Sequence, residues 1–383
     1  MWEAIGNARR CVVLETYTID PDVVGERTLQ VLIDARARGV QVTLIYDDVG
    51  SPHIGWSPLM SRLVQLGADV VSFNPISRRP WAVRHNPFMR NHRKIMVVDD
   101  EVAFCGSMNI TAEYVSPAMG GTGLFRDIHM RIRGPAVLDL LAVVRRVLRK
   151  KAAVRHEGVS AAAVAATNAY LQDPRLTPIR PALSAAPTLR ESRLQILEEN
   201  TLLRKRHIQN AVRVAFRDAR TSIFISTPYF IPPPRLRRAL LTAARAGVDV
   251  RILTTGSSDV LGTVWAGKYV MGRMLECGVK VYELGGEQCL HAKLITVDGV
   301  FSNVGSFNLD YLSTHRNLEV VVAAFDSRLA RELEVNFLSM TQAARQVSAT
   351  ELSSRSLPEQ FVHFCAYQFA RLWRKFNWFE ERQ

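Results

Sequence analysis

The sequence has 383 residues, of which 48% are hydrophobic and 22% charged. This length favours two domains of ordinary size, and this composition excludes a largely disordered chain. Lysine and arginine number 49 against 36 acidic residues, which gives a formal net charge of +13. Such a surplus indicates a polyanionic partner, either nucleic acid or an anionic membrane surface.

The cysteines and the hydropathy pattern narrow the class of protein further. The five cysteines form no CxxC pair and fit no zinc-ligand spacing, so we expect reduced thiols and no metal site. No apolar run reaches the roughly 18 residues of a spanning helix, and no secretory signal is visible. A membrane-associated protein of this sequence is therefore expected to lie on the bilayer.

The predicted elements occur twice in the same order. Each half begins with a strand, continues through a helix that ends at a glycine, and returns to a strand. In the first half these elements lie at residues 11–19, 28–39 and 42–46. In the second half the strands lie at 222–231 and 250–253, and the helix between them ends at Gly247. A second helix and strand follow in each half. This is the pattern of a βαβ unit. We predict an α/β fold of two duplicated domains, each a mixed β-sheet flanked by helices.

The pattern divides the chain into four parts. The N-terminal domain comprises residues 1–151, and an Ala-, Pro- and Ser-rich stretch at 152–192 is predicted to be an interdomain linker with some helical character. The C-terminal domain comprises 193–350, and 351–383 form an amphipathic aromatic–basic tail. The second domain opens with a strand at 194–197 that has no counterpart before Cys11. We therefore expect the first sheet to lack its opening strand.

One motif recurs late in each half. His92-x-Lys94 is followed after four residues by Asp99 and after six more by Gly-Ser107-x-Asn109, and His291-x-Lys293, Asp298 and Gly-Ser306-x-Asn308 repeat this spacing. With each residue type at roughly 5% usage, chance recurrence of six matches is negligible. An isolated His-x-Lys would usually mark a solvated strand edge, but the doubling argues against that interpretation.

These residue types suit chemistry at a phosphodiester. One histidine can attack phosphorus while a second protonates the leaving alcohol and deprotonates the incoming one. Lysine ammonium and asparagine amide groups can hold the non-bridging oxygens as negative charge grows. Each copy offers one histidine, so we expect the active site at the interface between the halves.

Four acidic residues accompany the motifs. Asp127 and Glu319 lie on β-rich runs after the motifs, where an acid needs a partner, and are candidates to orient the imidazoles. Asp99 and Asp298, in the motif itself, are catalytic candidates, although their place at the strand ends favours a structural role in turns.

These residues resemble the phospholipase D superfamily, whose signature is the doubled HKD motif, and the likeness covers nearly the whole chain. Within it, the sequence is most similar to bacterial cardiolipin synthases, in segments such as 14–17, 91–94, 109–114, 227–232 and 308–313. The resemblance implies that one phosphatidylglycerol forms a phosphatidyl-histidine and releases glycerol, and that a second then attacks to give cardiolipin.

The resemblance also implies roles for the site residues. It makes His92 the nucleophile and His291 the general acid and base, although the symmetry of the motifs leaves this assignment open. It implies no cofactor, neither metal nor nucleotide. The phosphate clamp would be formed by Lys94, Lys293, Asn109 and Asn308, with Asp127 and Glu319 behind the histidines.

Two segments bear on the partner. Residues 78–90 interleave arginines with Trp81 and Phe88, and 361–379 place aromatic residues at helical spacing among basic ones. Such segments suit an anionic phospholipid surface, here at the cytoplasmic face of the cell membrane, although a helix packed on the core is equally compatible with the tail. We expect no nucleic-acid partner and see no sign of an obligatory protein partner.

Three alternative functions remain. A hydrolytic phospholipase D differs only in using water as the acceptor, and phosphatidylethanolamine could replace phosphatidylglycerol as the donor. A nuclease could use the same chemistry, because basic and aromatic residues also bind single strands. An inactive lipid-binding scaffold is disfavoured because both motifs are complete.

Overall fold

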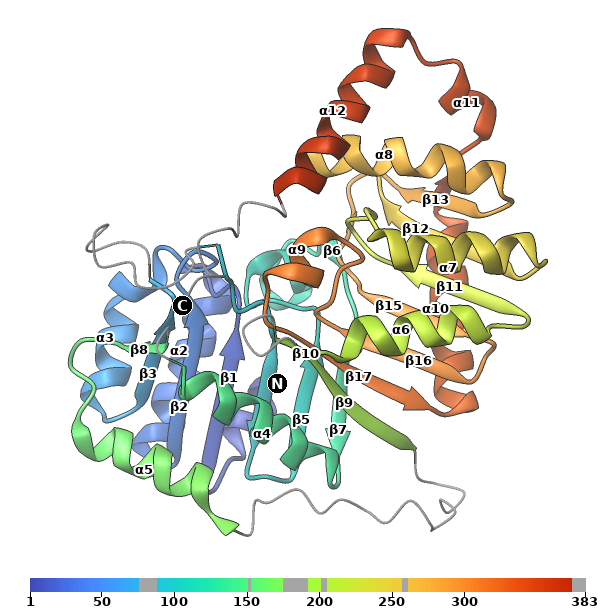
Figure 1. Cartoon of the computed structure of the whole chain (residues 1–383). Coiled ribbons are helices and arrows are strands. Elements are labelled where there is room, and N and C mark those ends of the chain that lie inside the picture. Colours follow the sequence, from blue (N-terminus) through green and yellow to red (C-terminus); the bar gives the residue numbers. More distant parts are fainter. Residues whose placement is uncertain (76–87, 151–152, 175–191, 201–204, 257–260, 374–383) are drawn as a thin grey trace, which may run out of the picture. The chain divides into compact units, whose positions relative to one another are not determined.

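The computed structural model describes residues 1–75, 88–150, 153–174, 192–200, 205–256 and 261–373. The chain divides into two compact units (Figure 1). Unit 1 comprises Met1–Gly123 and His129–Arg190, and unit 2 comprises Leu124–Ile128 and Glu191–Gln383. A short segment of the N-terminal half is therefore part of unit 2.

Unit 1 contains a seven-stranded mixed sheet in the order β7-β5-β4-β1-β2-β3-β8. The strands β1, β2 and β3 pair in parallel and the others antiparallel. Their bounds are β1 Cys11–Thr16, β2 Gln41–Asp47, β3 Asp69–Phe73, β4 Ile95–Val98, β5 Val102–Gly106, β7 His129–Arg133 and β8 Ala153–Arg155.

Helices cover this sheet and bury its central strands. They are α1 Trp2–Gly6, α2 Val23–Ala37, α3 Pro58–Gln65, α4 Ala136–Leu148 and α5 Ala161–Gln172. Alternate residues of the strands, such as Leu14 and Leu44, join the core with Leu32 of α2. Every residue of β1 is buried, as expected for a parallel strand whose two faces are both covered.

Unit 2 contains a nine-stranded mixed sheet in the order β10-β9-β17-β16-β15-β11-β12-β13-β18. The strands are β9 Arg193–Asn200, β10 Lys205–Arg206, β11 Ser222–Ser226, β12 Asp249–Thr255, β13 Lys280–Leu284, β15 Leu294–Val297, β16 Phe301–Gly305, β17 Glu319–Phe325 and β18 Ala344–Gln346. The helices are α6 His207–Asp218, α7 Pro234–Arg245, α8 Leu261–Glu276, α9 Tyr311–His315, α10 Ser327–Gln342, α11 Ala349–Ser353 and α12 Leu357–Trp373.

The two sheets share one topology. The order β7-β5-β4-β1-β2-β3 in unit 1 matches β17-β16-β15-β11-β12-β13 in unit 2. The prediction of two duplicated domains, each a mixed sheet flanked by helices, is confirmed. In unit 2, β9 pairs with β17, whereas the described sheet of unit 1 ends at β7, the counterpart of β17.

The predicted linker at 152–192 is wrong in its first part. There β8 pairs with β3, and α5 packs on the sheet of unit 1, where the Thr167 hydroxyl lies 3.2 Å from that of Thr43. Small residues suit a helix pressed against a sheet, so an alanine-rich composition did not signal a linker. Residues 175–191 of the predicted linker lie outside the described residues.

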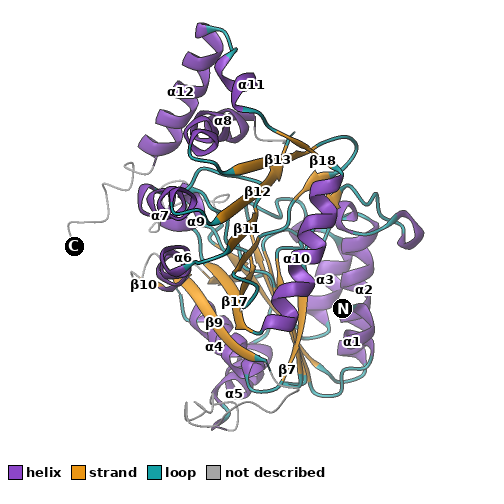
Figure 2. Ribbon diagram, turned by 90° about the vertical axis from the view of Figure 1, so that its right-hand side faces the viewer, coloured by secondary structure: helices purple, strands orange, loops and turns teal. Residues whose placement is uncertain are grey.

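The described part of the predicted tail, residues 351–373, runs through α11 and α12, which lie beside α8 (Figure 2), and residues 374–383 lie outside the described residues. Tyr269 of α8 stacks on Tyr367 with ring centroids 4.9 Å apart and meets Phe364 edge-on at 5.6 Å. Arg237 donates to the Tyr367 hydroxyl at 3.0 Å. One face of the amphipathic tail is thus packed on unit 2. Within the described ranges, no helix is both long enough and apolar enough to cross a membrane.

Candidate active site

In unit 2 the second motif begins just before β15, and its histidine is held from two directions. His291 Nδ1 lies 2.8 Å from Asp127 Oδ2, and both side chains are largely buried. Lys293 donates to the His291 carbonyl at 2.6 Å and places Nζ 3.1 Å from Nε2. With Nδ1–H donating to the carboxylate, Nε2 is the nitrogen left for nucleophilic or acid–base chemistry.

Asp127 reaches this site because its segment pairs with the strand before the motif. β6 (Phe125–Arg126) runs parallel to β14 (Cys289–Leu290). Cys289 and His291 donate their backbone N–H groups to the carbonyls of Leu124 and Arg126, both at 2.8 Å. The Phe125 ring lies 5.5 Å from the imidazole. This pairing fixes the backbone of the histidine and the carboxylate beside it together.

The Gly-Ser-x-Asn segment follows β16 and turns tightly against β17. A Cβ on Gly305 would lie 2.3 Å from the Val320 carbonyl oxygen, so this position requires glycine. The buried Ser306 hydroxyl then donates to Glu319, the first residue of β17. The segment thereby stays close to the end of β15 where His291 and Lys293 lie.

Glu319 is completely buried within a hydrogen-bonded network. Besides Ser306, it accepts from the Ser313 hydroxyl at 2.7 Å and from the Asn317 amide at 3.1 Å. The Ser313 hydroxyl in turn accepts the backbone N–H of Asn308 at 3.1 Å. Glu319 therefore organises both polar residues of the Gly-Ser-x-Asn segment.

Burial sets the electrostatics of this motif. Burial lowers the pKa of Lys293 to about 8, although Asp127, Glu319 and Asp310 partly oppose the shift. Burial also raises the pKa of Asp310 to about 6, with hydrogen bonds from backbone groups opposing it. An incoming phosphate would stabilise the charged form of Lys293, because its negative charge offsets the hydration that the ammonium loses on burial.

In unit 1 the first motif shares the contact between the lysine and the histidine backbone. Lys94 donates to the His92 carbonyl at 2.8 Å, as Lys293 does to His291. Asn109 donates to the Tyr114 hydroxyl at 3.1 Å, and Ser107 is completely buried. The amide oxygens of Asn109 and Asn308 are both buried without a hydrogen-bond partner among the described residues.

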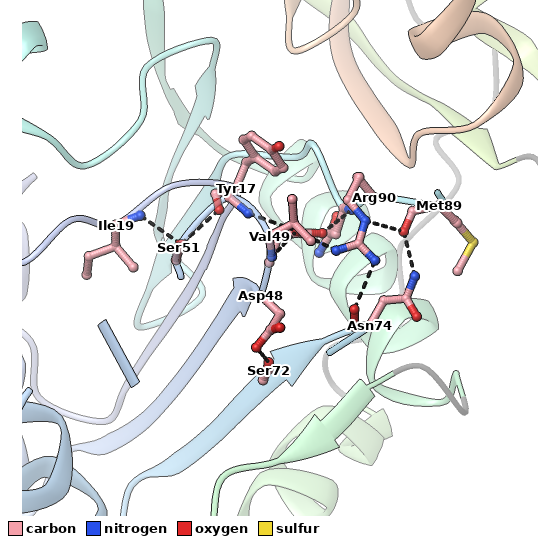
Figure 3. A network of polar contacts seen from close by, with 12 residues as sticks. Tyr17, Ile19, Asp48, Val49, Ser51, Ser72, Asn74, Met89 and Arg90 are labelled. Carbon is pink, nitrogen blue, oxygen red and sulfur yellow. Dashed lines mark hydrogen bonds and ion pairs between the residues drawn. The ribbon is translucent and has the colours of Figure 1, made fainter. Parts of the chain in front are cut away.

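Sequence reasoning missed the residues that surround His92. Tyr17 meets the imidazole edge-on at 5.0 Å and lies 5.1 Å from the Lys94 ammonium, a cation–π contact. Asp47 and Arg90 form a buried ion pair, and Figure 3 shows Arg90 within its network of polar contacts. The sequence did hold a signal for this pair, because Asp47 is a charged residue at the end of an apolar strand and Arg90 lies two residues before the histidine.

The motif aspartates lie at the other end of their strands and bind backbone. Asp298 accepts N–H groups from Arg220, Thr221 and Ser222 at 2.7–3.1 Å. Asp99 likewise accepts from the residues at the start of β1, at 2.8–2.9 Å. Both residues have a positive φ of 54°. These contacts support the structural alternative that the sequence left open for Asp99 and Asp298.

The structure thus places His291, Lys293, Ser306, Asn308, Asp127 and Glu319 at one end of the sheet of unit 2. It places His92, Lys94, Ser107 and Asn109 at the corresponding end of the sheet in unit 1. Among the described residues, no group of three His, Cys, Asp or Glu side chains could hold a metal ion.

Fold and motifs together define a phospholipase D-like protein with two histidine–lysine motifs. Residues 1–119 and 212–341 match the family described as cardiolipin synthase, PLD-like domain. The chain therefore belongs to the cardiolipin synthase family of phospholipase D-like enzymes.

Similar proteins agree with this assignment. The chain is 27% identical to a probable cardiolipin synthase of Bacillus subtilis over 97% of its own length and 68% of the relative's. It is 30% identical to a cardiolipin synthase of Halalkalibacterium halodurans over 92% and 66%. It therefore spans about two thirds of the length of these relatives.

The fold is also found in a solved structure. A phosphatidylserine synthase of Haemophilus influenzae matches 98% of this chain and 91% of its own with a TM-score of 0.70 and 17% sequence identity. At this identity the match concerns the fold alone.

Proposed function

We propose that this enzyme transfers a phosphatidyl group from one phosphatidylglycerol to another, making cardiolipin and releasing glycerol. The observation that carries the proposal is the imidazole of His291, held through Nδ1 by Asp127 and flanked at Nε2 by the buried ammonium of Lys293. A histidine so oriented can exchange a proton with an alcohol while a cation neutralises the phosphate.

The reaction needs two histidines acting on one phosphorus atom, and each motif supplies one. In the first step, His92 Nε2 attacks phosphorus, the bond to the glycerol oxygen breaks, and His291 gives that oxygen its proton. In the second, the hydroxyl of another phosphatidylglycerol loses its proton to His291 and attacks the phosphatidyl-histidine, which frees His92. His291 begins as the imidazolium, loses its Nε2 proton to the glycerol oxygen in the first step and regains one from the incoming hydroxyl in the second, so the cycle restores both imidazoles.

The remaining motif residues would hold the phosphate. Lys94 and Lys293 provide positive charge, and the amides of Asn109 and Asn308 can donate to the non-bridging oxygens. Ser107 and Ser306, both buried, would support the two asparagines. We assign Asp127 and Glu319 to orientation of the histidines and of this segment.

The experiment is incubation of the purified protein with phosphatidylglycerol vesicles, followed by separation of the lipids. Cardiolipin and glycerol in equal amounts are expected from the wild type, and none from His92→Ala or His291→Ala variants that remain folded. Phosphatidic acid as the main product would establish a hydrolase instead. Cleavage of labelled DNA without lipid turnover would establish a nuclease, and substantial activity in either variant would reject a shared site.

We further propose that α12 docks on an anionic phospholipid surface, at the cytoplasmic face of the membrane. Its outer side carries apolar residues at helical spacing, of which Phe361 and Phe369 are each 63% exposed and Leu372 is 48% exposed. The basic Arg371 is exposed beside them. Exposed aromatic residues with a neighbouring cation suit the bilayer interface.

The test of docking is a paired substitution on α12. Phe361→Ser with Phe369→Ser should reduce sedimentation with phosphatidylglycerol vesicles, because about 2 kcal/mol of apolar burial is lost per side chain. Val335→Ser, at a 66% exposed apolar position of α10, is the matched control. Equal binding by the paired variant, the control and the wild type would exclude α12 as the docking surface.

A further inference from the structure

The segment that carries His92 is fastened to its sheet by a buried ion pair. Arg90 Nη1 lies 3.1 Å from Asp47 Oδ1, and Asn91 donates its backbone N–H to Asp47 Oδ2 at 2.8 Å. Asp47 is completely buried and Arg90 is only 9% exposed. The two residues immediately before the histidine are therefore tied to the end of β2.

Further hydrogen bonds fix the course of this segment (Figure 3). Arg90 donates to the Asn74 carbonyl at 2.9 Å, and the Asn74 amide donates to the Met89 carbonyl at 2.8 Å. The buried Asn91 amide donates to Glu15 of β1 at 2.8 Å. Residues 89–91 thus have their backbone direction set by β1, β2 and the turn after β3.

Asp47 also shapes the turn that contacts Tyr17, the residue whose ring meets His92. Its Oδ1 accepts the backbone N–H groups of Val49 and Gly50 at 3.0 and 3.2 Å, which shapes the turn after β2. In that turn Ser51 donates to the Tyr17 carbonyl at 2.9 Å (Figure 3). A Cβ on Gly50 would lie 2.4 Å from the same carbonyl oxygen, so the turn presses directly against Tyr17.

One carboxylate therefore connects both supports of His92, the backbone that carries it and the turn behind the Tyr17 ring that meets it. We infer that Asp47 and Arg90 are positioning residues for His92, which set the orientation of its imidazole toward phosphorus. They touch neither substrate nor reacting atoms in this proposal. A misplacement of about 1 Å at a reacting group can reduce a rate about 100-fold.

The second motif is positioned by different means, which makes the ion pair particular to the first. The spacing from the histidine puts Cys289 and Leu290 where the first motif has Arg90 and Asn91. Strand register puts Thr255 where β2 has Asp47. There, backbone pairing of β14 with β6 fixes His291. Disruption of the ion pair should therefore affect His92 and leave His291 in place.

Titration provides a second consequence. Burial raises the pKa of Asp47 to about 6, against the opposing effect of Arg90 and of the N–H groups of residues 91, 50 and 49. Two further acidic groups lie close to it in the chain or the network: Asp48 follows it in the turn, and Glu15 accepts from the side chain of Asn91, whose backbone N–H donates to Asp47. As pH falls through about 6, Asp47 gains a proton and its attraction for Arg90 is lost. The orientation of His92 should then loosen.

The test compares Asp47→Asn with Asp69→Asn, which removes another buried Asp–Arg pair in the same unit. Asp69 pairs with Arg155 at 3.2 Å and makes none of the contacts around His92. We expect Asp47→Asn to lower kcat about 10- to 100-fold with little change in KM. The decrease in kcat expected of the wild type as pH falls through about 6 should be absent from this variant. Asp69→Asn should keep kcat within about twofold below its own melting temperature.

A measurement without turnover separates this inference from the proposed function, on which its kinetic readout rests. In protein labelled with ¹⁵N-histidine, the His92 ring signals are those missing from His92→Ala. Asp47→Asn should shift these signals at pH 7 and leave those of His291 unchanged, whether or not lipid is turned over. Unchanged His92 signals, or a kcat in Asp47→Asn equal to that of Asp69→Asn, would overturn the positioning role.

Discussion

Replacing Asp127 by asparagine removes one charge from the pair that orients His291 and changes little else in shape. The hydrogen bond is 2.8 Å long, with side-chain exposures of 13% for the histidine and 6% for the aspartate. A hydrogen bond to a charged group at such a site contributes roughly 1.5–3 kcal/mol. If this energy is expressed fully in the transition state, where the imidazole carries positive charge, kcat falls roughly 10- to 160-fold.

The assay is steady-state cardiolipin formation from phosphatidylglycerol vesicles at saturating lipid. Asp249→Asn is the matched control, because it also removes a carboxylate that pairs with cations in unit 2, Arg251 and Lys280, but near the surface. The control should retain wild-type kcat. His291→Ala gives the floor, and adding Asp127→Asn to it should cost nothing more. A further loss in that double variant, or wild-type kcat in Asp127→Asn, would refute the role assigned to this carboxylate.

Two more predictions follow from single residues of unit 2. Because burial lowers the pKa of Lys293 to about 8, the free enzyme loses this cation as pH rises through that value, so kcat/KM should fall above pH 8. The Lys293→Arg variant stays charged, so it should be less active than the wild type but should not show that fall. The same fall of kcat/KM above pH 8 in this variant would contradict the assignment. Asp298→Ala leaves three backbone N–H groups without their charged acceptor, so the free energy of unfolding measured with denaturant should fall by roughly 1.5–3 kcal/mol. The kcat of the folded variant should stay near that of the wild type. A large loss of kcat with unchanged stability would show that Asp298 is catalytic.

The sequence alone determined the duplication and the motif residues. Strands and helices in βαβ order can be predicted from local hydropathy and from the positions of glycines, because both are properties of residues that are close in sequence. The spacing of His, Lys and Gly-Ser-x-Asn could be read directly because each motif lies on consecutive elements. Asp127 and Glu319 also stood out, since an acid within a β-rich run needs a partner.

Only the tertiary structure decided which partners these residues have. Asp127 pairs with His291, which lies far along the chain, because β6 adds to β14, and no local pattern encodes that pairing. The same holds for Asp47 and Arg90, which meet across β2 and the segment before β4. Residues 161–172 show the converse: their composition suggested a linker with some helical character, and the helix they form, α5, packs against the sheet. Composition reports local preference, whereas burial and ion pairing depend on which distant elements pack together.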